Sequence, residues 1–185
     1  MKKVLVIGSG GAGKSTFAAR LSRVLDIEVI HLDVLYWKPG WIETPKPEWR
    51  EKVAALVKRD AWIIDGNYSG TFDIRFAAGD TVIFLDVARR VCLWRVLKRL
   101  VLYRRGGRPD MAAGCKERFD LQFLIWIWNY PGRTRQKVLK LFREGSSGKE
   151  TIRLRTQAEI EGLLAKLVHE THTKRDHSSV ESIEG

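Results

Sequence analysis

The chain is poor in cysteine and proline, with two and five of these residues among 185. Cys92 and Cys115 stand far apart and form neither a CxxC pair nor part of a histidine cluster. This spacing argues against a disulfide framework and against a structural zinc site. The simplest role for both thiols is buried packing in a reducing compartment, so we expect a cytoplasmic protein.

Long apolar runs are also missing. The most apolar later stretch, residues 123–128, is far shorter than the about 20 residues that a transmembrane helix needs. The apolar run at residues 4–7 ends in glycines and is too short for the core of a signal peptide. We therefore expect no membrane partner.

Acidic residues are scarce relative to basic ones, with 22 Asp and Glu against 33 Lys and Arg, which gives a formal net charge of +11. Such an excess predicts anionic ligands: nucleotides, sugar phosphates or nucleic acid. The length leaves little room for a second core, because domains usually span about 100–200 residues. We predict one domain over residues 1–170. The polar tail at 171–185 lacks a core-forming pattern, and we expect it to be disordered.

What the chain does have is a regular alternation of strand and helix patterns. Predicted strands are 4–7, 28–30, 61–65, 81–85 and 151–154. Predicted helices are 14–25, a segment ending near 58, 88–103, a region from 119 interrupted near Pro131, and 157–168. Alternation of this kind implies a parallel sheet covered on both faces. The predicted fold is a three-layer α/β/α P-loop NTPase fold with a five-stranded parallel sheet and a small arginine-rich lid at about 104–118.

The clearest motif is GSGGAGKS, which matches GxxxxGK[ST] and stands between a predicted strand and a helix start. Its glycines let backbone N–H groups turn toward phosphates, and the helix N-terminus adds partial positive charge there. Lys14 would reach the β- and γ-phosphates and the Ser15 hydroxyl would bind magnesium. The predicted ATP-binding set is Gly8, Ser9, Gly10, Gly11, Ala12, Gly13, Lys14, Ser15 and Thr16. The alternative is a glycine-rich turn followed by a chance Lys-Ser pair.

A magnesium-bound triphosphate also needs a carboxylate near this loop, and two aspartates follow predicted strands. Asp65 ends an apolar strand and precedes a glycine, so we prefer it as the magnesium ligand together with Ser15. Asp65 could instead begin a turn. Asp86 is the other candidate, and it could equally serve as a helix N-cap.

Basic residues dominate the segment 87–109, which contains eight of them and no acid. Arg95 and Arg99 are four residues apart and so share a helix face, a spacing suited to clamping a transferred phosphoryl group. A second basic group without acids follows the glycine-rich loop: Arg133, Arg135, Lys137, Lys140 and Arg143. The alternative for these side chains is a solvated helix face.

The order of these parts resembles the nucleoside monophosphate kinases, of which adenylate kinase is the best-known member. That resemblance implies lid arginines at Arg95 and Arg99, post-lid arginines at Arg133 and Arg135, and a strand-end Asp-Gly at 65–66. The segments HLDVLYWKPGW, WIIDGNYSGTFDIR, RPDM and FLIWIWNYPGRTR resemble, nearly end to end, the bacterial DNA topology modulation proteins, an adenylate-kinase-related family.

The acceptor side departs from the adenylate kinase pattern. Adenylate kinases read Asp-Gly-Phe-Pro-Arg where this chain reads DGNYS, so the arginine for an acceptor phosphate is missing, with Arg75 a possible substitute. Asp33 follows the second strand, where small-molecule P-loop kinases place a carboxylate that binds an acceptor hydroxyl; a turn aspartate is the alternative. Several aromatic residues could stack on a ring or pack in the core: Tyr36, Trp37, Trp41, Trp49, Trp126 and Trp128.

Together these patterns predict a kinase that transfers the γ-phosphoryl group of ATP, with magnesium, to a small acceptor. The predicted catalytic residues are Lys14, Arg95, Arg99, Arg133, Arg135 and Asp33. Two alternatives stay open: a nucleotide-regulated DNA-binding protein, and an ATP-binding protein without turnover. The sequence carries no recognisable DNA-binding motif, so we expect DNA contact to be weak or indirect.

Overall fold

The structure is a computed structural model that describes residues 1–103, 110–115, 118–144 and 148–181. Its main sheet has five parallel strands in the order β2-β5-β1-β6-β7. The strands are β1 (Lys3–Gly8), β2 (Val29–His31), β5 (Trp62–Asp65), β6 (Thr81–Leu85) and β7 (Glu150–Leu154). The predicted fold class is confirmed, and P-loop and sheet stand where the sequence placed them.

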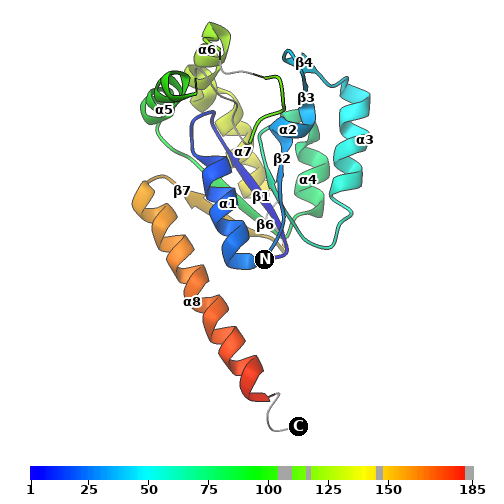
Figure 1. The fold of residues 1–185 in the computed structure, drawn as a ribbon, viewed down its shortest axis with the longest axis vertical. Coiled ribbons are helices and arrows are strands. Elements are labelled where there is room, and N and C mark those ends of the chain that lie inside the picture. Colours follow the sequence, from blue (N-terminus) through cyan, green and yellow to red (C-terminus); the bar gives the residue numbers. More distant parts are fainter. Residues whose placement is uncertain (104–109, 116–117, 145–147, 182–185) are drawn as a thin grey trace.

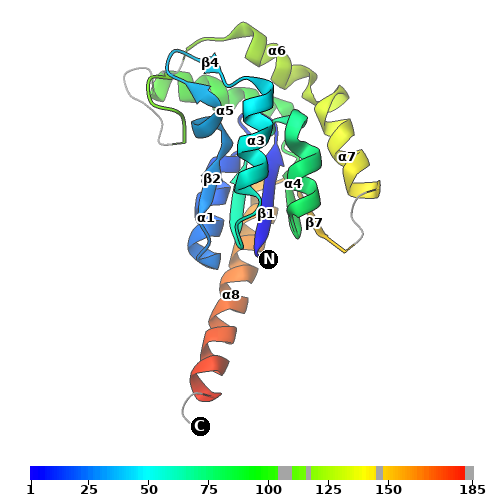
Figure 2. The same cartoon turned by 90° about the vertical axis from the view of Figure 1, so that its right-hand side faces the viewer.

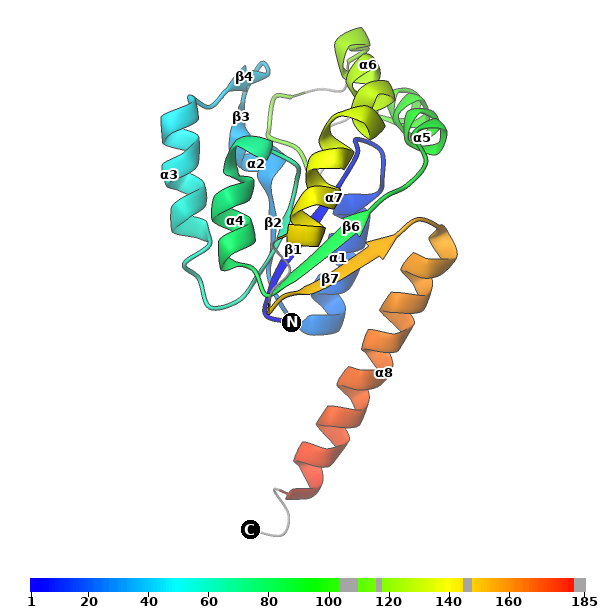
Figure 3. The same cartoon turned by 180° about the vertical axis from the view of Figure 1, so that it is seen from behind.

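Helices cover both faces of this sheet (Figures 1 and 3). One core forms with α1 (Lys14–Leu25), α5 (Arg89–Leu102) and α8 (Gln157–Glu181), and the other with α3 (Lys46–Leu56), α4 (Phe72–Ala78) and α7 (Thr134–Glu144). α6 (Leu121–Asn129) lies with α5 beyond the carboxyl ends of the strands (Figure 2). α5 and α6 therefore cover the carboxyl ends of the strands, where the P-loop lies.

The central strands are apolar without alternation because both of their faces are buried. In β1, Val4 and Val6 point into one core, while Leu5 and Ile7 point into the other. The register sets Val6 opposite Asp65 and Gly8 opposite Leu85. The carboxyl ends of β5, β1 and β6 thus lie together on one side of the sheet, and Asp65 and Gly8 stand there.

The segment after β2 contains a short helix and a hairpin, neither of which is among the predicted elements. It forms α2 (Leu32–Tyr36) and a hairpin of β3 (Trp37–Lys38) and β4 (Ile42–Glu43). Gly40 at φ +80° and Trp41 at φ +65° make the turn between the two short strands. Aromatic packing holds the hairpin, since the Trp37 and Trp41 rings meet edge to face with centroids 5.3 Å apart. A sequence pattern based on glycine and proline alone misses such contacts.

The last helix is longer than predicted. Instead of ending at Val168, α8 continues to Glu181 and projects away from the sheet (Figures 1 and 3). The helix thus includes residues 171–181 of the expected tail, while the expectation of disorder stays a prediction and residues 182–185 lie outside the described part. Leu164 and Leu167 are the last buried residues of the helix up to residue 173, the end of the stretch whose burial is described. Beyond them no glycine or proline stops the helical hydrogen bonds. No helix within the described residues is both long and apolar enough to cross a membrane.

Candidate functional site

The P-loop runs from the end of β1 into the first turn of α1. Gly11 has a φ of +76°, a backbone conformation that favours glycine. A Cβ at this position would also stand 2.3 Å from the Cys92 carbonyl oxygen, so both the conformation and the space require glycine. The Lys14 Nζ donates to the Ser9 carbonyl oxygen at 3.1 Å. The amino group therefore lies across the loop, where a bound phosphate would meet it.

Asn67 fastens the start of this loop, a role that sequence reasoning missed. Its Nδ2 donates to the Gly8 carbonyl oxygen at 2.6 Å, and its Oδ1 accepts from the Gly8 N–H at 3.2 Å. The Gly66 N–H bonds to the Val6 carbonyl oxygen at 3.2 Å. The segment after β5 is thus tied directly to the entry of the P-loop. In the sequence, this role is indicated only by the position of Asn67, whose side-chain amide directly follows the strand-end Asp-Gly.

Asp65 lies at the end of β5, one strand from the P-loop, and is 5% exposed. Its Oδ2 contacts His31 Nδ1 at 3.0 Å, and this bond, more than any other contact, raises the pKa of His31. Its Oδ1 is buried without a hydrogen-bond partner among the described residues. An Asp65 carboxylate oxygen without a partner, one strand from the loop that carries Ser15, suits a magnesium ion that keeps most of its water ligands. The magnesium assignment stays a prediction.

Asp86 offers no such free oxygen. Arg135 Nε donates to its Oδ1 at 2.8 Å, and Arg153 Nε donates to its Oδ2 at 2.8 Å. The structure thus places Arg135, on the first turn of α7, in an ion pair with the end of β6. Arg133, two residues before it, is exposed. The catalytic roles predicted for both arginines stay predictions.

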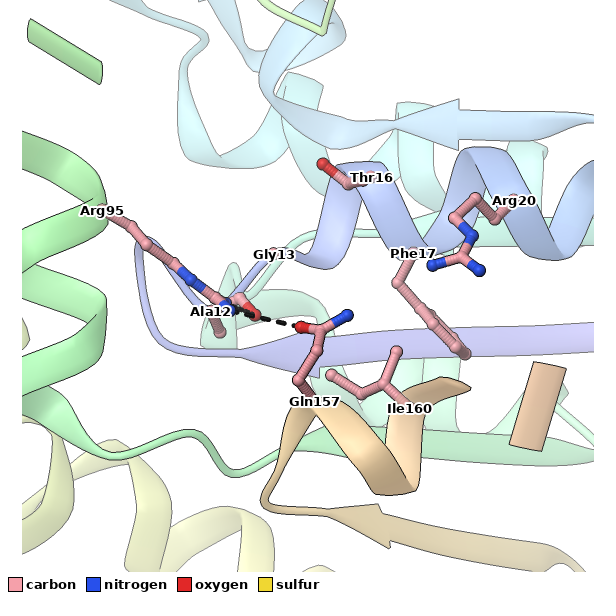
Figure 4. A pocket seen from close by; sticks show the side chains of 8 residues that line it. All are labelled: Ala12, Gly13, Thr16, Phe17, Arg20, Arg95, Gln157 and Ile160. Atoms are coloured by element: carbon pink, nitrogen blue, oxygen red, sulfur yellow. Dashed lines mark hydrogen bonds between the residues drawn. The ribbon is translucent and has the colours of Figure 1, made fainter. Parts of the chain in front are cut away.

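Arg95 closes one side of a cavity of about 180 Å³ next to the P-loop (Figure 4). Its Nη1 donates to the Ala12 carbonyl oxygen at 3.1 Å, and its Nη2 to Gln157 Oε1 at 3.3 Å. The cavity is lined by Ala12, Gly13, Thr16, Phe17, Arg20, Arg95, Gln157 and Ile160. Arg99 lies one helical turn further along α5 and is half-buried. Within the predicted lid, residues 104–109 and 116–117 lie outside the described part.

On the other side of the P-loop, α2 carries Asp33. Its Oδ1 accepts a hydrogen bond from the Tyr68 hydroxyl at 2.5 Å. Burial above all, and then the Asp33 charge, raises the pKa of Tyr68, so the phenol stays protonated and donates. The Tyr36 ring lies 4.6 Å from the Tyr68 ring. The carboxylate is thus held in place beside an aromatic wall.

The aromatic residues divide between packing and exposure. Trp49 is 4% exposed and belongs to the core, and Trp126 packs against Tyr130. Trp37 is half-buried, and so its ring can still meet a ligand at the acceptor side. Trp128 is exposed, with the Arg89 guanidinium 3.9 Å from its ring centroid.

Arg75, considered as a substitute for the missing acceptor arginine, is placed otherwise. It is fully buried, and it donates to the carbonyl oxygens of the loop at 66–68 and to Thr71 Oγ1. Burial lowers the pKa of Arg75 to about 9, which still leaves the guanidinium charged at neutral pH. Its N–H groups donate to atoms within the chain. The prediction that Arg75 replaces the missing acceptor arginine is therefore wrong.

Two solved structures share this fold. The deoxyadenosine kinase from M. mycoides with bound dATP superposes with a TM-score of 0.50 at 20% identity, covering 90% of this chain and 99% of that one. The shikimate kinase from Acinetobacter baumannii in complex with shikimate gives 0.54 at 16% identity, covering 94% of each chain. The fold and the P-loop therefore define a protein with the P-loop kinase fold.

The particular family follows from sequence. Over 133 residues the chain is 30% identical to the uncharacterized protein YqaC of Bacillus subtilis, covering 70% of this chain and 72% of YqaC. The chain belongs to the YqaC family. No protein-family profile matches it. None of these relatives is named for DNA, so the resemblance to DNA topology modulation proteins stays a prediction.

Proposed function

We propose that the protein is a magnesium-dependent phosphotransferase that moves the γ-phosphoryl group of ATP to a hydroxyl group of a small acceptor. The observation that carries the proposal is that a P-loop and a positioned carboxylate lie together at the carboxyl ends of the strands. A complete P-loop stands beside Asp33, a carboxylate held by the Tyr68 hydroxyl at 2.5 Å.

The donor side follows from the P-loop and the cavity next to it. Backbone N–H groups at the start of α1 and the Lys14 amino group would hold the β- and γ-phosphates. The cavity beside Gly13 would take the base or ribose, with Arg95 and Gln157 at its wall (Figure 4). Ser15 and Asp65 would hold magnesium, which neutralises phosphate charge when bound.

On the acceptor side, Asp33 would accept the proton of the attacking hydroxyl. The new bond forms between that oxygen and the γ-phosphorus, the bond to the bridging β–γ oxygen breaks, and ADP leaves. Tyr68 would keep the carboxylate aimed, while Tyr36 and Trp37 offer faces for a ring. Positioning of this kind supplies most of the catalysis in phosphoryl transfer.

A hydroxyl acceptor fits better than a nucleoside monophosphate. Arg75 is buried on backbone carbonyls, and Arg50 is paired with Asp73 at 2.7 Å, so neither is available to an acceptor phosphate. The neighbours in fold are kinases of deoxyadenosine and of shikimate, both of which carry hydroxyl groups. We infer the same class of acceptor here.

The test is a screen for ADP release from magnesium-ATP with nucleosides, sugars, hydroxylated acids and nucleoside monophosphates. We expect turnover with a hydroxylated, phosphate-free acceptor. Asp33→Asn should abolish that turnover while ATP affinity by calorimetry stays within about twofold, because Asp33 lies on the acceptor side. A clear preference for nucleoside monophosphates would overturn the hydroxyl assignment. ATP binding with no turnover across the panel would favour the binding protein without catalysis.

A further inference from the structure

A second cavity, of about 390 Å³, lies behind the P-loop at the carboxyl ends of β6 and β7. The start of α5, the end of α6 and the start of α7 carry other residues of its lining. The sheet order sets β6 and β7 on one side of β1, and β2 and β5 on the other. This cavity is therefore separate from Asp33, and Arg95 does not line it.

Arginine dominates the lining, with four guanidinium groups, of Arg89, Arg135, Arg153 and Arg155, against the single carboxylate of Asp86. Arg135 and Arg153 share that carboxylate, so it balances only one of the two charges. Arg89 donates to the Trp128 carbonyl oxygen at 3.3 Å and stacks on its ring, both uncharged partners. Among the described residues, no carboxylate pairs with the Arg155 guanidinium. Three positive charges are therefore left without a compensating negative charge.

The lining of the same cavity includes a buried tyrosine whose hydroxyl group has no hydrogen-bond partner among the described residues. This residue is Tyr130, which is 4% exposed. A buried polar group is usually bonded to protein, water or ligand. Burial raises the pKa of Tyr130, so the phenol is a hydrogen-bond donor at neutral pH. A phenol donor and several guanidinium groups in the lining of one cavity suit an oxyanion.

We propose that this cavity binds a small phosphorylated metabolite as an effector site that adjoins the P-loop at Ser9 and uses Arg135 in place of the catalytic role predicted for that residue. It is separate from the cavity that Arg95 lines. The charge favours a phosphate over a monocarboxylate, since guanidinium forks match phosphate oxygens in pairs. A volume of about 390 Å³ falls within the range of about 300–1,000 Å³ seen for small-molecule sites, so an organic portion fits beside the phosphate.

The P-loop links this site to ATP. Ser9 lines the cavity, and the Ser9 carbonyl oxygen accepts the hydrogen bond from Lys14 Nζ. A ligand against Ser9 touches the segment that positions Lys14. Occupancy of the cavity therefore changes the affinity for ATP, and ATP changes the affinity for the effector by the same factor.

The experiment is calorimetric titration of inorganic pyrophosphate into the full-length Lys14→Ala variant without magnesium, which suppresses binding at the P-loop. We expect one site that is weakened about tenfold or more by Arg155→Gln combined with Arg89→Gln, since each removes a charge-assisted bond. The control is Arg23→Gln combined with Arg59→Gln, which removes the same charge far from the cavity. The control pair should leave affinity within about twofold.

Equal weakening by both pairs would reduce the effect to overall charge and overturn the proposal, as would the absence of binding. Tyr130→Phe gives a second check, because it should weaken pyrophosphate without altering the arginines. Circular dichroism of each variant verifies folding. The titration requires no turnover, so its outcome is independent of the phosphotransferase assignment.

Discussion

Replacing Arg75 by Met asks whether this guanidinium supports the loop after β5 or serves a ligand. The side chain donates through Nε to Thr71 Oγ1 at 3.2 Å, through Nη1 to the Gly66 carbonyl oxygen at 2.9 Å, and through Nη2 to the Tyr68 carbonyl oxygen at 3.0 Å. Nη2 also donates to the Asn67 carbonyl oxygen. Met fills similar space but offers no donor, so these acceptors lose their partner.

The magnitude follows from the count of acceptors. A buried acceptor left unsatisfied costs about 1–3 kcal/mol, although water and local relaxation recover part of it. Removing a buried charge also relieves its desolvation, which offsets some of the loss. We expect a net loss of about 3–5 kcal/mol. With a urea dependence of about 2 kcal/mol per molar, the midpoint of unfolding should fall by about 1.5–2.5 M.

The assay is urea unfolding followed by tryptophan fluorescence, with Arg50→Met as the control. Arg50 forms an exposed pair with Asp73, and exposed pairs contribute little, so its loss should leave the midpoint nearly unchanged. Arg75→Lys should recover only part of the stability, because an ammonium lacks the planar fork. If Arg75→Met stayed within about 1 kcal/mol of the parent while acceptor binding fell, the side chain would serve the acceptor and the structural role would be refuted.

Three further predictions concern the site. Lys14→Ala should weaken magnesium-ATP binding without unfolding the domain, and unchanged affinity by calorimetry would contradict the P-loop assignment. Arg99→Ala should lower turnover about a hundredfold, by more than it weakens ATP binding, whereas Arg95→Ala should reduce both because Arg95 lines the cavity beside the P-loop; steady-state kinetics separate the two cases. His31 has a pKa raised above 6.5 by its bond to Asp65, so the stability from this pair is fully present below pH 6.5 and is lost as pH rises through the raised pKa. An NMR titration should show that pKa return toward 6.5 in Asp65→Asn.

The fold and the P-loop were predictable because their signals are local. A buried strand followed by GSGGAGKS needs no knowledge of distant residues, since the turn, the helix start and the phosphate site all lie within one segment. The extent of α8 was not predictable in the same way. Its final turns carry no apolar stripe, and pattern reasoning stops a helix where its buried face stops.

Contacts between distant segments explain what sequence reasoning missed at the site. Asp86 could be predicted as a magnesium ligand or a helix N-cap, yet its partners, Arg135 and Arg153, lie 49 and 67 residues away. Asn67 reaches Gly8 across 59 residues. The Asn67–Gly8 and Asp86–Arg153 pairs form because the parallel register brings the ends of neighbouring strands together. Arg135 reaches Asp86 from the first turn of α7. Charge spacing along the chain contains no information about these distances.

The placement of charge around β1 fits the proposal that this basic chain acts on a phosphate-free acceptor. On the β2 and β5 side, three cations are engaged: Lys38 lies 3.5 Å from Glu48, Arg50 pairs with Asp73, and Arg75 is buried on carbonyls. On the β6 and β7 side, four arginines face one carboxylate. Positive charge is thus concentrated where polyphosphate or a phosphorylated effector would bind. The acceptor side instead presents Asp33, whose carboxylate is held by the Tyr68 hydroxyl and would accept a hydrogen bond from the hydroxyl group of the proposed acceptor.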